Sequence, residues 1–405
     1  MSDYDVVVIG AGAIGGVAAR SAAEAGARVL LLERKGETAE PSLCTGLVSP
    51  RTLFALGITE LSCLRSIRSV VAHAPGGRRL TIRTPTAKAL VLDRSRVEGQ
   101  LRKRAADAGV AVRFQCDACS VRAGEVAFRS PRGRETVSAG IVVGAIGLNE
   151  TFARIASFPR PPRLFNAAQA SVAYESDEED TVRVYLGRET APRFFGWAVP
   201  AEPGGMRVGV AVPPGMDPGP FLDGLLQRRF ADTPVRFRRH GRIPIGPVRE
   251  PIGDGFLLVG DAAGHVKPLS GGGLYTGAIC ARIAGRIAAA AAIQGRTKRE
   301  DLGTYVDACE RAIGSELRFG LAARDLLESL SDEGIDEAFA LLDRPELLRF
   351  VGEVGDIDRL RHLPREIASR RSLWSRILPL LSLIDRHLAA RGRQQRLAAS
   401  PDAPL

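Results

Sequence analysis

Residues 4–15 read Tyr-Asp-Val-Val-Val-Ile-Gly-Ala-Gly-Ala-Ile-Gly, an apolar run that ends in the pattern Gly-x-Gly-x-x-Gly. Such a run is typical of a strand that is buried on both faces of a parallel sheet. The Ala-rich segment 14–25 predicts a helix, and residues 28–33 predict a second buried strand that ends at Glu33. In this strand–helix–strand context the glycine pattern indicates a dinucleotide-binding turn. We therefore predict an α/β protein with a Rossmann-like domain.

Each glycine of the turn has a physical role in holding a dinucleotide. Gly10 permits the tight turn, Gly12 lets the backbone approach a pyrophosphate, and Gly15 lets helix and strand pack closely. The N-terminus of the helix offers free N–H groups and about half a positive charge to the phosphates. Glu33 is expected to accept hydrogen bonds from a ribose.

A second motif decides which dinucleotide the turn holds. Residues 256–259 predict a buried strand that leads into Gly260-Asp261, and the triple glycine 271–273 opens a long helix that extends to about residue 294. Asp261 is expected to bond the ribityl hydroxyls of FAD. The helix start is expected to lie near the flavin ring, where the helix dipole stabilises the negative charge of the reduced ring. The cofactor is therefore predicted to be FAD.

The rest of the chain predicts a second, sheet-rich domain and a helical C-terminal region. Alternating strands at 181–186 and 206–212, separated by Gly and Pro, indicate an antiparallel sheet. The predicted FAD-binding domain is discontinuous and contains residues 1–72, 93–160 and 243–300. The predicted antiparallel-sheet substrate domain contains residues 73–92 and 161–242, and it is followed by the helical region 301–390 and a tail, 391–405.

Composition narrows the classes of function. The chain has 405 residues, of which 45% are hydrophobic, enough for a buried core in two or three domains. The net charge is +10, but no basic stripe interleaved with aromatic residues points to nucleic acid. An acidic N-terminus, scattered cysteines and the lack of an apolar run of 18 residues predict a cytoplasmic protein without a signal peptide or transmembrane helix.

Four stretches resemble the geranylgeranyl reductase family, FAD-dependent members of the hydroxylase-type flavoprotein superfamily. They are Cys-Thr-Gly-Leu-Val-Ser-Pro at 44–50, Asp-Arg-Ser-Arg at 93–96, Pro-Arg-Phe-Phe-Gly-Trp-Ala-Val-Pro at 192–200 and Gly-Asp-Ala-Ala-Gly-His-Val-Lys-Pro at 260–268. In the third stretch, Phe195 stands where the family usually has Tyr, and Val199 where it usually has Phe. The resemblance implies an oxidoreductase that saturates carbon–carbon double bonds of a geranylgeranyl chain on a lipid.

The resemblance also implies the residues of the site. Cys44 is the candidate proton donor or gate beside the flavin, and His265 is a candidate flavin partner or proton relay. Aromatic rings suit an isoprenoid chain and the positive charge that develops when an alkene is protonated, so the expected substrate-binding residues are Pro192, Phe194, Phe195, Trp197 and Pro200. The expected cofactor-binding residues are Gly10, Gly12, Ile14, Gly15, Glu33, Arg34, Cys44, Thr45, Gly46, Arg96, Ala118, Asp261, Lys267, Gly272, Gly273 and Leu274.

Structural interpretations compete with several of these roles. Cys44 is also interpretable as an inert buried thiol, His265 as a structural residue, and Lys267 as part of a solvated loop. The aromatic stretch around Trp197 is also interpretable as an ordinary sheet core. No metal site is predicted.

Other functions stay open as well. Phe195-x-Trp197-x-Val199-Pro200 also resembles the WxWxIP motif of flavin halogenases, so a flavin-dependent monooxygenase or halogenase is an alternative. A flavoprotein dehydrogenase that passes electrons to quinone is another. Because no second Gly-x-Gly-x-x-Gly follows a strand, the electron donor is expected to be transient NAD(P)H, a deazaflavin or a ferredoxin, which would be a partner protein. The segment 370–391, with Trp374 among Leu and Arg, predicts a peripheral contact with the cytoplasmic face of a membrane.

Overall fold

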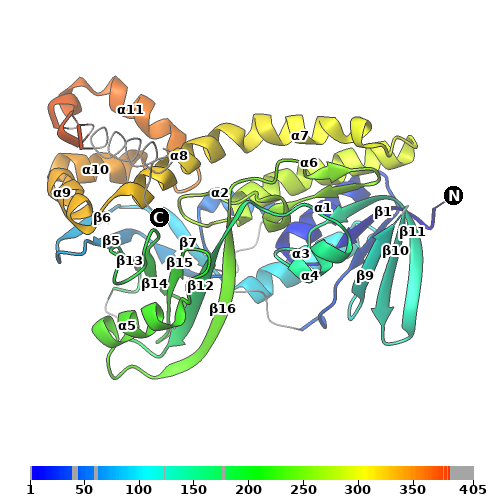
Figure 1. The fold of residues 1–405 in the computed structure, drawn as a ribbon, viewed down its shortest axis with the longest axis horizontal. Coiled ribbons are helices and arrows are strands. Elements are labelled where there is room, and N and C mark those ends of the chain that lie inside the picture. Colours follow the sequence, from blue (N-terminus) through cyan, green and yellow to red (C-terminus); the bar gives the residue numbers. More distant parts are fainter. Residues whose placement is uncertain are drawn as a thin grey trace, which may run out of the picture. The chain divides into compact units, whose positions relative to one another are not determined.

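The computed structural model describes residues 2–38, 44–58, 63–122, 124–175, 178–376, 378–380 and 382–383. The chain divides into two compact units (Figure 1). Unit 1 contains residues 1–64, 92–164 and 242–318, and unit 2 contains residues 65–91, 165–241 and 319–405. The predicted tail, 391–405, lies outside the described residues, as do residues 384–390.

Unit 1 contains an eight-stranded sheet whose centre is parallel. Five strands follow one another in the order β18-β11-β1-β2-β8, and all four of these pairs are parallel. Antiparallel strands extend the sheet: β17 pairs with β18, β10 pairs with the first half of the long β11, and β9 pairs with β10. The strands are β1 (Tyr4–Ile9), β2 (Val29–Leu32), β8 (Ala111–Arg113), β9 (Asp117–Arg122), β10 (Glu125–Ser130), β11 (Gly133–Gly144), β17 (Ile252–Gly253) and β18 (Phe256–Leu258).

Close helix packing in unit 1 depends on small residues. Helix α1 packs against α3 and α6, and a side chain at Gly16 would press on Leu101 of α3. At Gly285 of α6 a Cβ would lie 2.3 Å from the Ala18 carbonyl oxygen, so only glycine permits this approach. The helical elements of unit 1 are α1 (Ala13–Glu24), α2 (Pro50–Leu56), α3 (Arg94–Asp107), α4 (Glu150–Ile155), η1 (Gly260–Ala263), α6 (Leu274–Ile293), η2 (Arg299–Leu302), α7 (Gly303–Cys309) and the π-helix η3 (Glu310–Gly314).

Helix α6 is long and apolar enough to cross a membrane by length and composition. It is nevertheless a core helix of unit 1, because its small residues, among them Ala281, Ala284 and Ala288, are fully buried. The opposite core of this unit joins Val7 and Ile9 of β1 to Phe128, Phe152 and Phe158. The predicted strand and helix segments of the dinucleotide region are confirmed to within a few residues.

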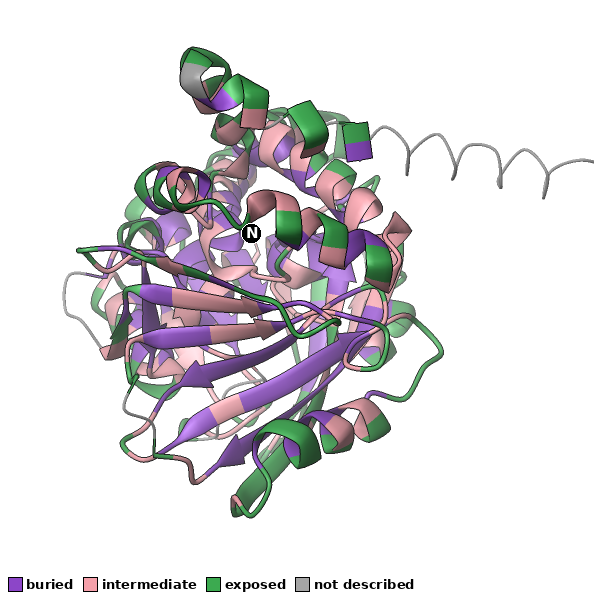
Figure 2. Ribbon diagram, turned by 90° about the vertical axis from the view of Figure 1, so that its left-hand side faces the viewer, coloured by how far each residue is buried: buried purple, intermediate pink, exposed green. Residues whose placement is uncertain are grey.

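Unit 2 is built on a seven-stranded sheet with the order β16-β12-β15-β14-β13-β5-β6. Figure 2 shows most of its strands in the colour of buried residues. The pairs from β12 to β13 are antiparallel, as predicted, but β13 and β5 pair in parallel, which the alternation pattern did not show. The strands are β5 (Ser69–His73), β6 (Arg79–Arg83), β12 (Arg163–Val172), β13 (Thr181–Tyr185), β14 (Gly196–Pro200), β15 (Met206–Val212) and β16 (Val235–Ile245).

Helices complete unit 2 and lie on its sheet. Leu222, Leu225 and Leu226 of α5 pack on β14 and β15, while Ile335 and Phe339 of α9 share a core with Leu80 of β6. The helical elements are α5 (Gly219–Arg229), α8 (Ser315–Ser329, which begins in unit 1), α9 (Asp332–Leu342), α10 (Pro345–Val354), η4 (Leu360–His362), α11 (Leu363–Ser369) and η5 (Arg371–Leu373). The short strands β3 (Leu47–Val48), β4 (Cys63–Ile67) and β7 (Ala89–Leu92) complete the description.

The boundaries of the two units differ from the predicted domains at two places. Segment 65–72 belongs to unit 2, because β5 pairs with β13 there. The helices predicted as one region from residue 301 are divided at residue 318, and α7 packs on α6 of unit 1.

Candidate active site

The dinucleotide turn has the backbone geometry that its glycines predict. Gly10 has a φ of +101°, and a Cβ there would lie 2.4 Å from the Ala145 carbonyl oxygen. A Cβ at Gly15 would lie only 1.8 Å from the Gly10 carbonyl oxygen. At Gly12, by contrast, a Cβ would meet no described atom within 4 Å. The turn is therefore closed on the side of the sheet and open at Gly12, the position predicted to approach a pyrophosphate.

Glu33 closes the same edge of the sheet. Its carboxylate accepts the N–H groups of Ala11 (2.8 Å) and Lys35 (2.9 Å), which joins the end of β2 to the glycine turn. The Glu33 carbonyl accepts the Cys116 N–H at 2.8 Å, so the segment that leads to Ala118 lies beside it. Arg34 is exposed. Glu33 is thus held at the carboxyl ends of the parallel strands, where dinucleotides bind in folds of this kind.

Ile14 connects the turn to the second predicted motif. Its side chain lies so close to Gly260 and Gly277 that a Cβ at either glycine would lie about 3 Å from it. Gly260 has a φ of +71° and opens η1, which carries Asp261. Two motifs that are about 250 residues apart in sequence therefore meet at one edge of the sheet.

Asp261 lies against the beginning of α6. A Cβ at Gly273 would lie 2.8 Å from Asp261 Oδ1, so the glycine at the helix N-cap leaves room for this carboxylate. Burial raises the pKa of the Asp261 carboxyl, and the charge of Arg94 partly offsets that rise. Leu274 is the first residue of α6, whose first turn carries no acidic side chain to neutralise the helix dipole.

Lys267 packs over the glycine loop that precedes α6. Its side chain is 9% exposed and lies over Gly272, where a Cβ would meet Cε at 3.0 Å. The loop is closed by two backbone hydrogen bonds between Lys267 and residues 271 and 272. The interpretation of Lys267 as part of a solvated loop is therefore wrong.

Cys44 belongs to a charged cluster that the sequence did not predict. Its Sγ accepts the Gly46 N–H at 3.3 Å and is also hydrogen-bonded by the guanidinium of Arg94. Arg94 forms an ion pair with Glu98 one turn later on α3, and both side chains are largely buried. Burial lowers the pKa of Arg94, but its interactions with Cys44 and Glu98 outweigh the effect of burial, so the pKa lies above its ordinary value.

Arg94, rather than Arg96, faces the predicted cofactor site. The side chain of Arg96 is 76% exposed and pairs with Asp93, which caps α3 by accepting the Arg96 N–H. The prediction of Arg96 as a cofactor residue therefore finds no support in its position. Within the described residues, the Nε of Arg94 is buried and has no hydrogen-bond partner. Such a donor is costly to leave unpaired, and a bound ligand would supply the missing acceptor.

His265 points into the packing of α6 and α7. It is 5% exposed, its Nδ1 accepts the Gly260 N–H at 3.3 Å, and its carbonyl accepts the Thr276 hydroxyl. One of its ring nitrogens and the sulfur atoms of Cys280 and Cys309 lie within 4.8 Å of one another. Because Nδ1 is an acceptor here, the neutral ring carries its proton on Nε2 and is poorly suited to bind a metal there. These contacts favour the structural interpretation of His265.

The buried His265 predicts a loss of stability in acid. Burial lowers the pKa of His265 to about 4, whereas the unfolded chain has the ordinary value of 6.5. Below pH 6.5 only the unfolded state takes up the proton, so stability falls as the pH falls from about 6.5 to about 4. Between pH 7 and pH 5 we expect this group to lower the free energy of unfolding by about 2 kcal/mol. Chemical denaturation of the parent and of His265→Asn, at equal FAD concentration, measures the free energy of unfolding at each pH. If this free energy fell equally steeply with pH in both proteins, the prediction would be contradicted.

The predicted substrate residues lie together in unit 2. Phe194 stacks on Phe195 with ring centroids 4.6 Å apart, and Phe195 meets Trp197 edge-on at 6.2 Å. Trp197 Nε1 donates to Gln169 Oε1 at 3.1 Å, and its ring covers the backbone of Gly209. Phe194 and Trp197 are 2% and 8% exposed, so both belong to the core of the sheet. Pro200 is also buried, which leaves Pro192 and Phe195 as the half-exposed members.

A buried arginine organises this aromatic segment. The guanidinium carbon of Arg324, on α8, lies 4.0 Å from the centroid of Phe194 and 5.8 Å from that of Phe165. Its Nη1 donates to the carbonyl of Arg193 at 2.9 Å, and Arg193 has a φ of +58°. Arg324 is fully buried. Because Arg324 and Phe195 both pack on Phe194, that ring supports Phe195 rather than facing a substrate.

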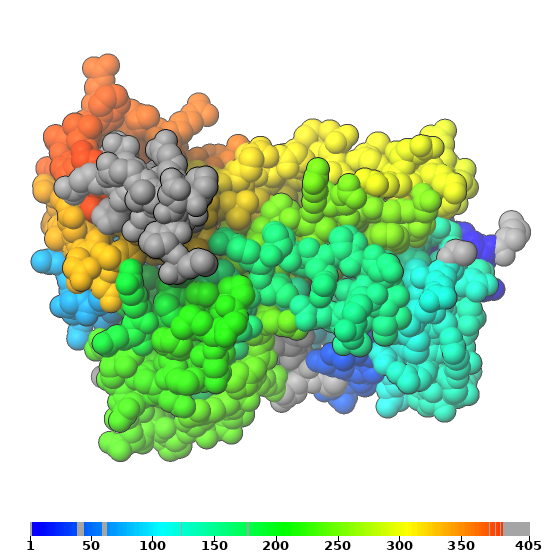
Figure 3. Space-filling model, viewed as in Figure 1, coloured from blue at the N-terminus to red at the C-terminus, as the bar shows by residue number. Residues whose placement is uncertain are grey.

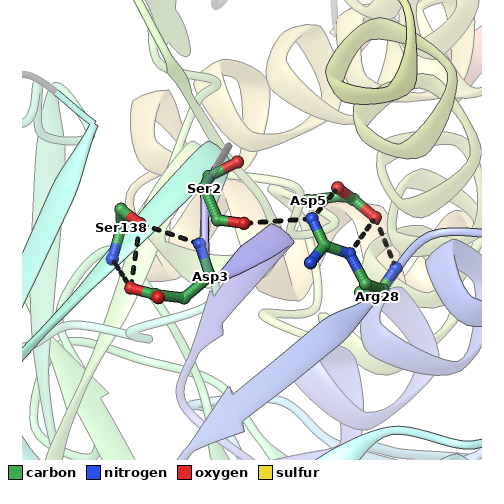
Figure 4. A network of polar contacts seen from close by, with 5 residues as sticks. All are labelled: Ser2, Asp3, Asp5, Arg28 and Ser138. Carbon is green, nitrogen blue, oxygen red and sulfur yellow. Dashed lines mark hydrogen bonds and ion pairs between the residues drawn. The ribbon is translucent and has the colours of Figure 1, made fainter.

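One depression in unit 1 lies at the other end of the sheet. It has a volume of about 700 Å³ and is lined by the starts of β1, β2 and β8, including Tyr4, Val29 and Ala111. Polar contacts close its rim: the Asp3 carboxylate accepts from Ser138, and Arg28 bonds Asp5 and the Ser2 carbonyl (Figure 4). This is the amino end of the parallel strands, opposite the edge that carries Gly10 and Glu33. It is therefore not the dinucleotide site.

Comparison with known proteins shows the family of the chain. A family model described as FAD binding domain matches residues 3–212, just over half of the chain. The digeranylgeranylglycerophospholipid reductase 2 of Methanothermobacter thermautotrophicus is 35% identical, over 85% of this chain and 93% of that protein. The chain belongs to the digeranylgeranylglycerophospholipid reductase family. A second member of this reductase family, from Methanopyrus kandleri, is 33% identical over 86% of this chain.

A solved structure has the same fold as this reductase-family chain. The geranylgeranyl bacteriochlorophyll reductase-like protein of Thermoplasma acidophilum aligns with a TM-score of 0.80 at 22% identity. The alignment covers 94% of this chain and 99% of that one. The predicted fold class, an FAD-binding α/β domain with a sheet-rich second part and C-terminal helices, is confirmed.

The residues present fit FAD, the cofactor that the family model implies. The turn is open at Gly12, the Asp261 carboxylate lies beside the N-terminus of α6, and the buried Nε of Arg94 has no acceptor among the residues that the structure describes. A pyrophosphate needs free N–H groups, a polyol needs an anion, and a flavin ring needs a cation. The three features supply these groups.

Proposed function

We propose that the protein is an FAD-dependent reductase that saturates carbon–carbon double bonds of a geranylgeranyl chain carried on a lipid. The observation that carries the proposal is 35% identity, over 85% of the chain, to an enzyme named for this reaction. The cluster of Cys44, Arg94 and Asp261 at the FAD edge supports it, because the reaction needs a proton source next to a hydride source.

The FAD would be held by groups from three parts of unit 1. The pyrophosphate would meet the N–H groups of the turn at Gly12 and the start of α1, and Glu33 would bond the adenosine ribose. Asp261 would accept from the ribityl hydroxyls, while the start of α6 would lie at the ring. When bound and reduced, FAD supplies the hydride of the reaction.

Cys44 is the proposed proton donor. An isolated alkene has no carbonyl to polarise, so a proton must reach one carbon as the hydride reaches the other. The Cys44 thiol would release this proton, and the neighbouring guanidinium of Arg94 would stabilise the negative charge left on sulfur. The ion pair with Glu98 keeps Arg94 in place. Arg94 is therefore proposed as a positioning residue, and Phe195 and Pro192 as contacts for the prenyl chain.

Cys44→Ala is expected to lower kcat by about 100-fold or more, the usual contribution of a positioned general acid. The visible spectrum of bound FAD should stay the same, since the backbone around Gly46 holds the loop. The rate is measured in a single turnover by monitoring the reoxidation of the flavin. The rate of Cys44→Ser should lie between those of Cys44→Ala and the parent. Unchanged turnover in both variants would remove Cys44 from the mechanism.

The function itself is tested with a geranylgeranyl lipid and dithionite under anaerobic conditions. Mass spectrometry should show two added hydrogens for each double bond reduced. Product that appears only with oxygen, or only with oxygen and halide, would replace the reductase by a monooxygenase or halogenase. Product that is quinol, with the lipid unchanged, would indicate the quinone-linked dehydrogenase.

The electron donor is proposed to be transient NAD(P)H, a reduced deazaflavin or a ferredoxin. Replacing dithionite by each donor in turn identifies it, because only the physiological donor should sustain multiple turnovers. A ferredoxin would make the donor a partner protein.

A peripheral location at the cytoplasmic face of a membrane is part of the proposal. Trp374 and Leu378 are 51% and 57% exposed, and Arg370 pairs with Glu353 at 2.9 Å. Residues 377, 381 and 384–391 of the predicted contact segment 370–391 lie outside the described residues.

A further inference from the structure

Residues 228–240, called the arginine arm below, concentrate positive charge at one place on unit 2. The arm runs from the end of α5 into the edge strand β16 and reads Arg-Arg-Phe-Ala-Asp-Thr-Pro-Val-Arg-Phe-Arg-Arg-His. The arm contains five arginines and one acid, Asp232. These thirteen residues therefore carry four of the ten net positive charges of the chain. The end of α5 and the start of β16 are drawn green in Figures 1 and 3.

The arginines of the arm differ in the groups that hold them. Arg228 donates to the Glu189 carbonyl at 3.3 Å, and Arg236 donates to the Gly204 carbonyl at 3.2 Å. Arg229 lies 5.7 Å from the ring of Tyr185. The groups named for Arg228 and Arg229 are neutral, whereas Arg236 also helps to lower the pKa of Glu202 and Arg238 pairs with the carboxylate of Asp223 on α5.

Two apolar side chains stand exposed among these charges. Val235 and Phe237 are 41% and 46% exposed, and exposed apolar residues carry information where they lie together rather than singly. They are two residues apart on a strand and therefore share one side, and the guanidinium carbon of Arg239 lies 5.0 Å from the Phe237 ring. All four residues from 235 to 238 are exposed, so both sides of the strand are open.

We propose that the arginine arm docks the enzyme on an anionic lipid surface, with Phe237 and Val235 entering the headgroup boundary. Arginine stems bury apolar length while their heads reach phosphates, and a basic patch with a few apolar residues is the usual signature of surface binding. The arm has a single exposed Phe, Tyr or Trp, too few for the stacking of successive bases that single-stranded nucleic acid binding uses. The proposal rests on the proposed function in one respect: it explains how the protein reaches a substrate that resides in a membrane.

The test compares two triple variants of equal charge. One replaces Arg228, Arg229 and Arg236 by Gln in the arm. The control replaces Arg129, Arg132 and Arg134 by Gln in the β10–β11 hairpin of unit 1, where all three are also exposed and no large apolar residue of the described hairpin is exposed. Binding of the FAD-loaded, full-length variants is measured by sedimentation with vesicles of phosphatidylglycerol mixed with phosphatidylcholine, and with phosphatidylcholine alone.

The arm variant is expected to bind the anionic vesicles about 100-fold more weakly, at about 1 kcal/mol for each cation near such a surface. Binding to the anionic vesicles should fall less in the control than in the arm variant, and high salt should weaken binding of the parent. Phe237→Ser should lower binding by roughly 10-fold, with a smaller dependence on salt. Reduction of a detergent-dispersed geranylgeranyl lipid should be unchanged in all three variants, which separates this proposal from the proposed function.

Three results would overturn the proposal. An equal loss of vesicle binding in the arm and hairpin variants would show that binding depends on the total charge of the protein and not on the arm. A loss of vesicle binding in Trp374→Ser but not in the arm variant would show that the C-terminal segment, and not the arm, contacts the membrane. Full vesicle binding by the arm variant, with turnover lost only when a reduced acidic iron–sulfur protein is the donor, would make the arm a docking site for protein.

Discussion

Asp261→Ala is expected to raise the Kd for FAD by about 100-fold, with loss of the yellow colour during gel filtration. The expectation rests on the place of the carboxylate, which lies against Gly273 at the start of α6 and near the charge of Arg94. Hydrogen bonds to a charged group contribute about 1.5–3 kcal/mol each, and removal of this group also leaves Arg94 with less compensation. Fluorescence titration of the apoprotein with FAD measures the Kd.

Two further variants make that result specific. Asp261→Asn keeps a neutral acceptor and should bind FAD with an affinity between alanine and the parent. Asp3→Ala removes a carboxylate at the opposite end of the same sheet, where it accepts the N–H and hydroxyl of Ser138 (Figure 4), and should leave FAD affinity unchanged. An Asp261→Ala variant that keeps its full complement of flavin would contradict the assigned contact.

Arg324→Met is expected to have the largest effect on stability. The variant removes the hydrogen bond to the Arg193 carbonyl and the cation over Phe194, both inside a fully buried site. A buried carbonyl left without its donor costs about 1–3 kcal/mol, and a desolvated cation–π contact contributes about 2 kcal/mol. We expect unit 2 to lose about 3 kcal/mol, which lowers its Tm by roughly 6–12 °C.

The activity of Arg324→Met should fall as well, because Arg193 in its left-handed conformation and the stacked Phe194 hold Phe195. FAD binding should persist, since the predicted FAD residues belong to unit 1. Arg318→Met is the matched control on the same helix: this arginine is 66% exposed and pairs with Glu310, so the change should be small. A loss of stability as large in Arg318→Met as in Arg324→Met would contradict the proposed role of the buried guanidinium.

Local spacing was enough to predict the glycine turn and its backbone geometry. Gly10, Gly12 and Gly15 act through the backbone of one turn, and Glu33 ends the next strand along the chain. Their geometry follows from steric rules that apply within a strand–helix–strand unit. The same holds for the Gly260-Asp261 turn, whose strand and helix are adjacent in sequence. FAD therefore followed from the residues without knowledge of distant contacts.

Motif reasoning named Arg96 of the Asp93–Arg96 stretch, whereas the structure largely buries Arg94 and exposes Arg96. Successive residues of a helix are rotated by about 100°, so Arg94 and Arg96 point about 200° apart. The buried residues Val97, Leu101 and Ala105 place the core-facing side of α3 on the face of Arg94. This helical period was readable in the sequence and would have selected Arg94, together with Glu98 four residues later.

By itself, the sequence determined the glycine turn, the acid that follows each key strand, the cofactor class and the aromatic segment, because each is encoded by residues within about thirty positions. Only the tertiary structure decided that Arg94 contacts Cys44 and lies near enough to Asp261 to affect its pKa, that Arg324 lies over Phe194, and that His265 faces two thiols. The partners in these contacts lie up to about 170 residues apart. Their pairing depends on how helices α3, α6 and α8 pack. The free energy of that packing comes from contacts throughout the core, and no single motif determines it.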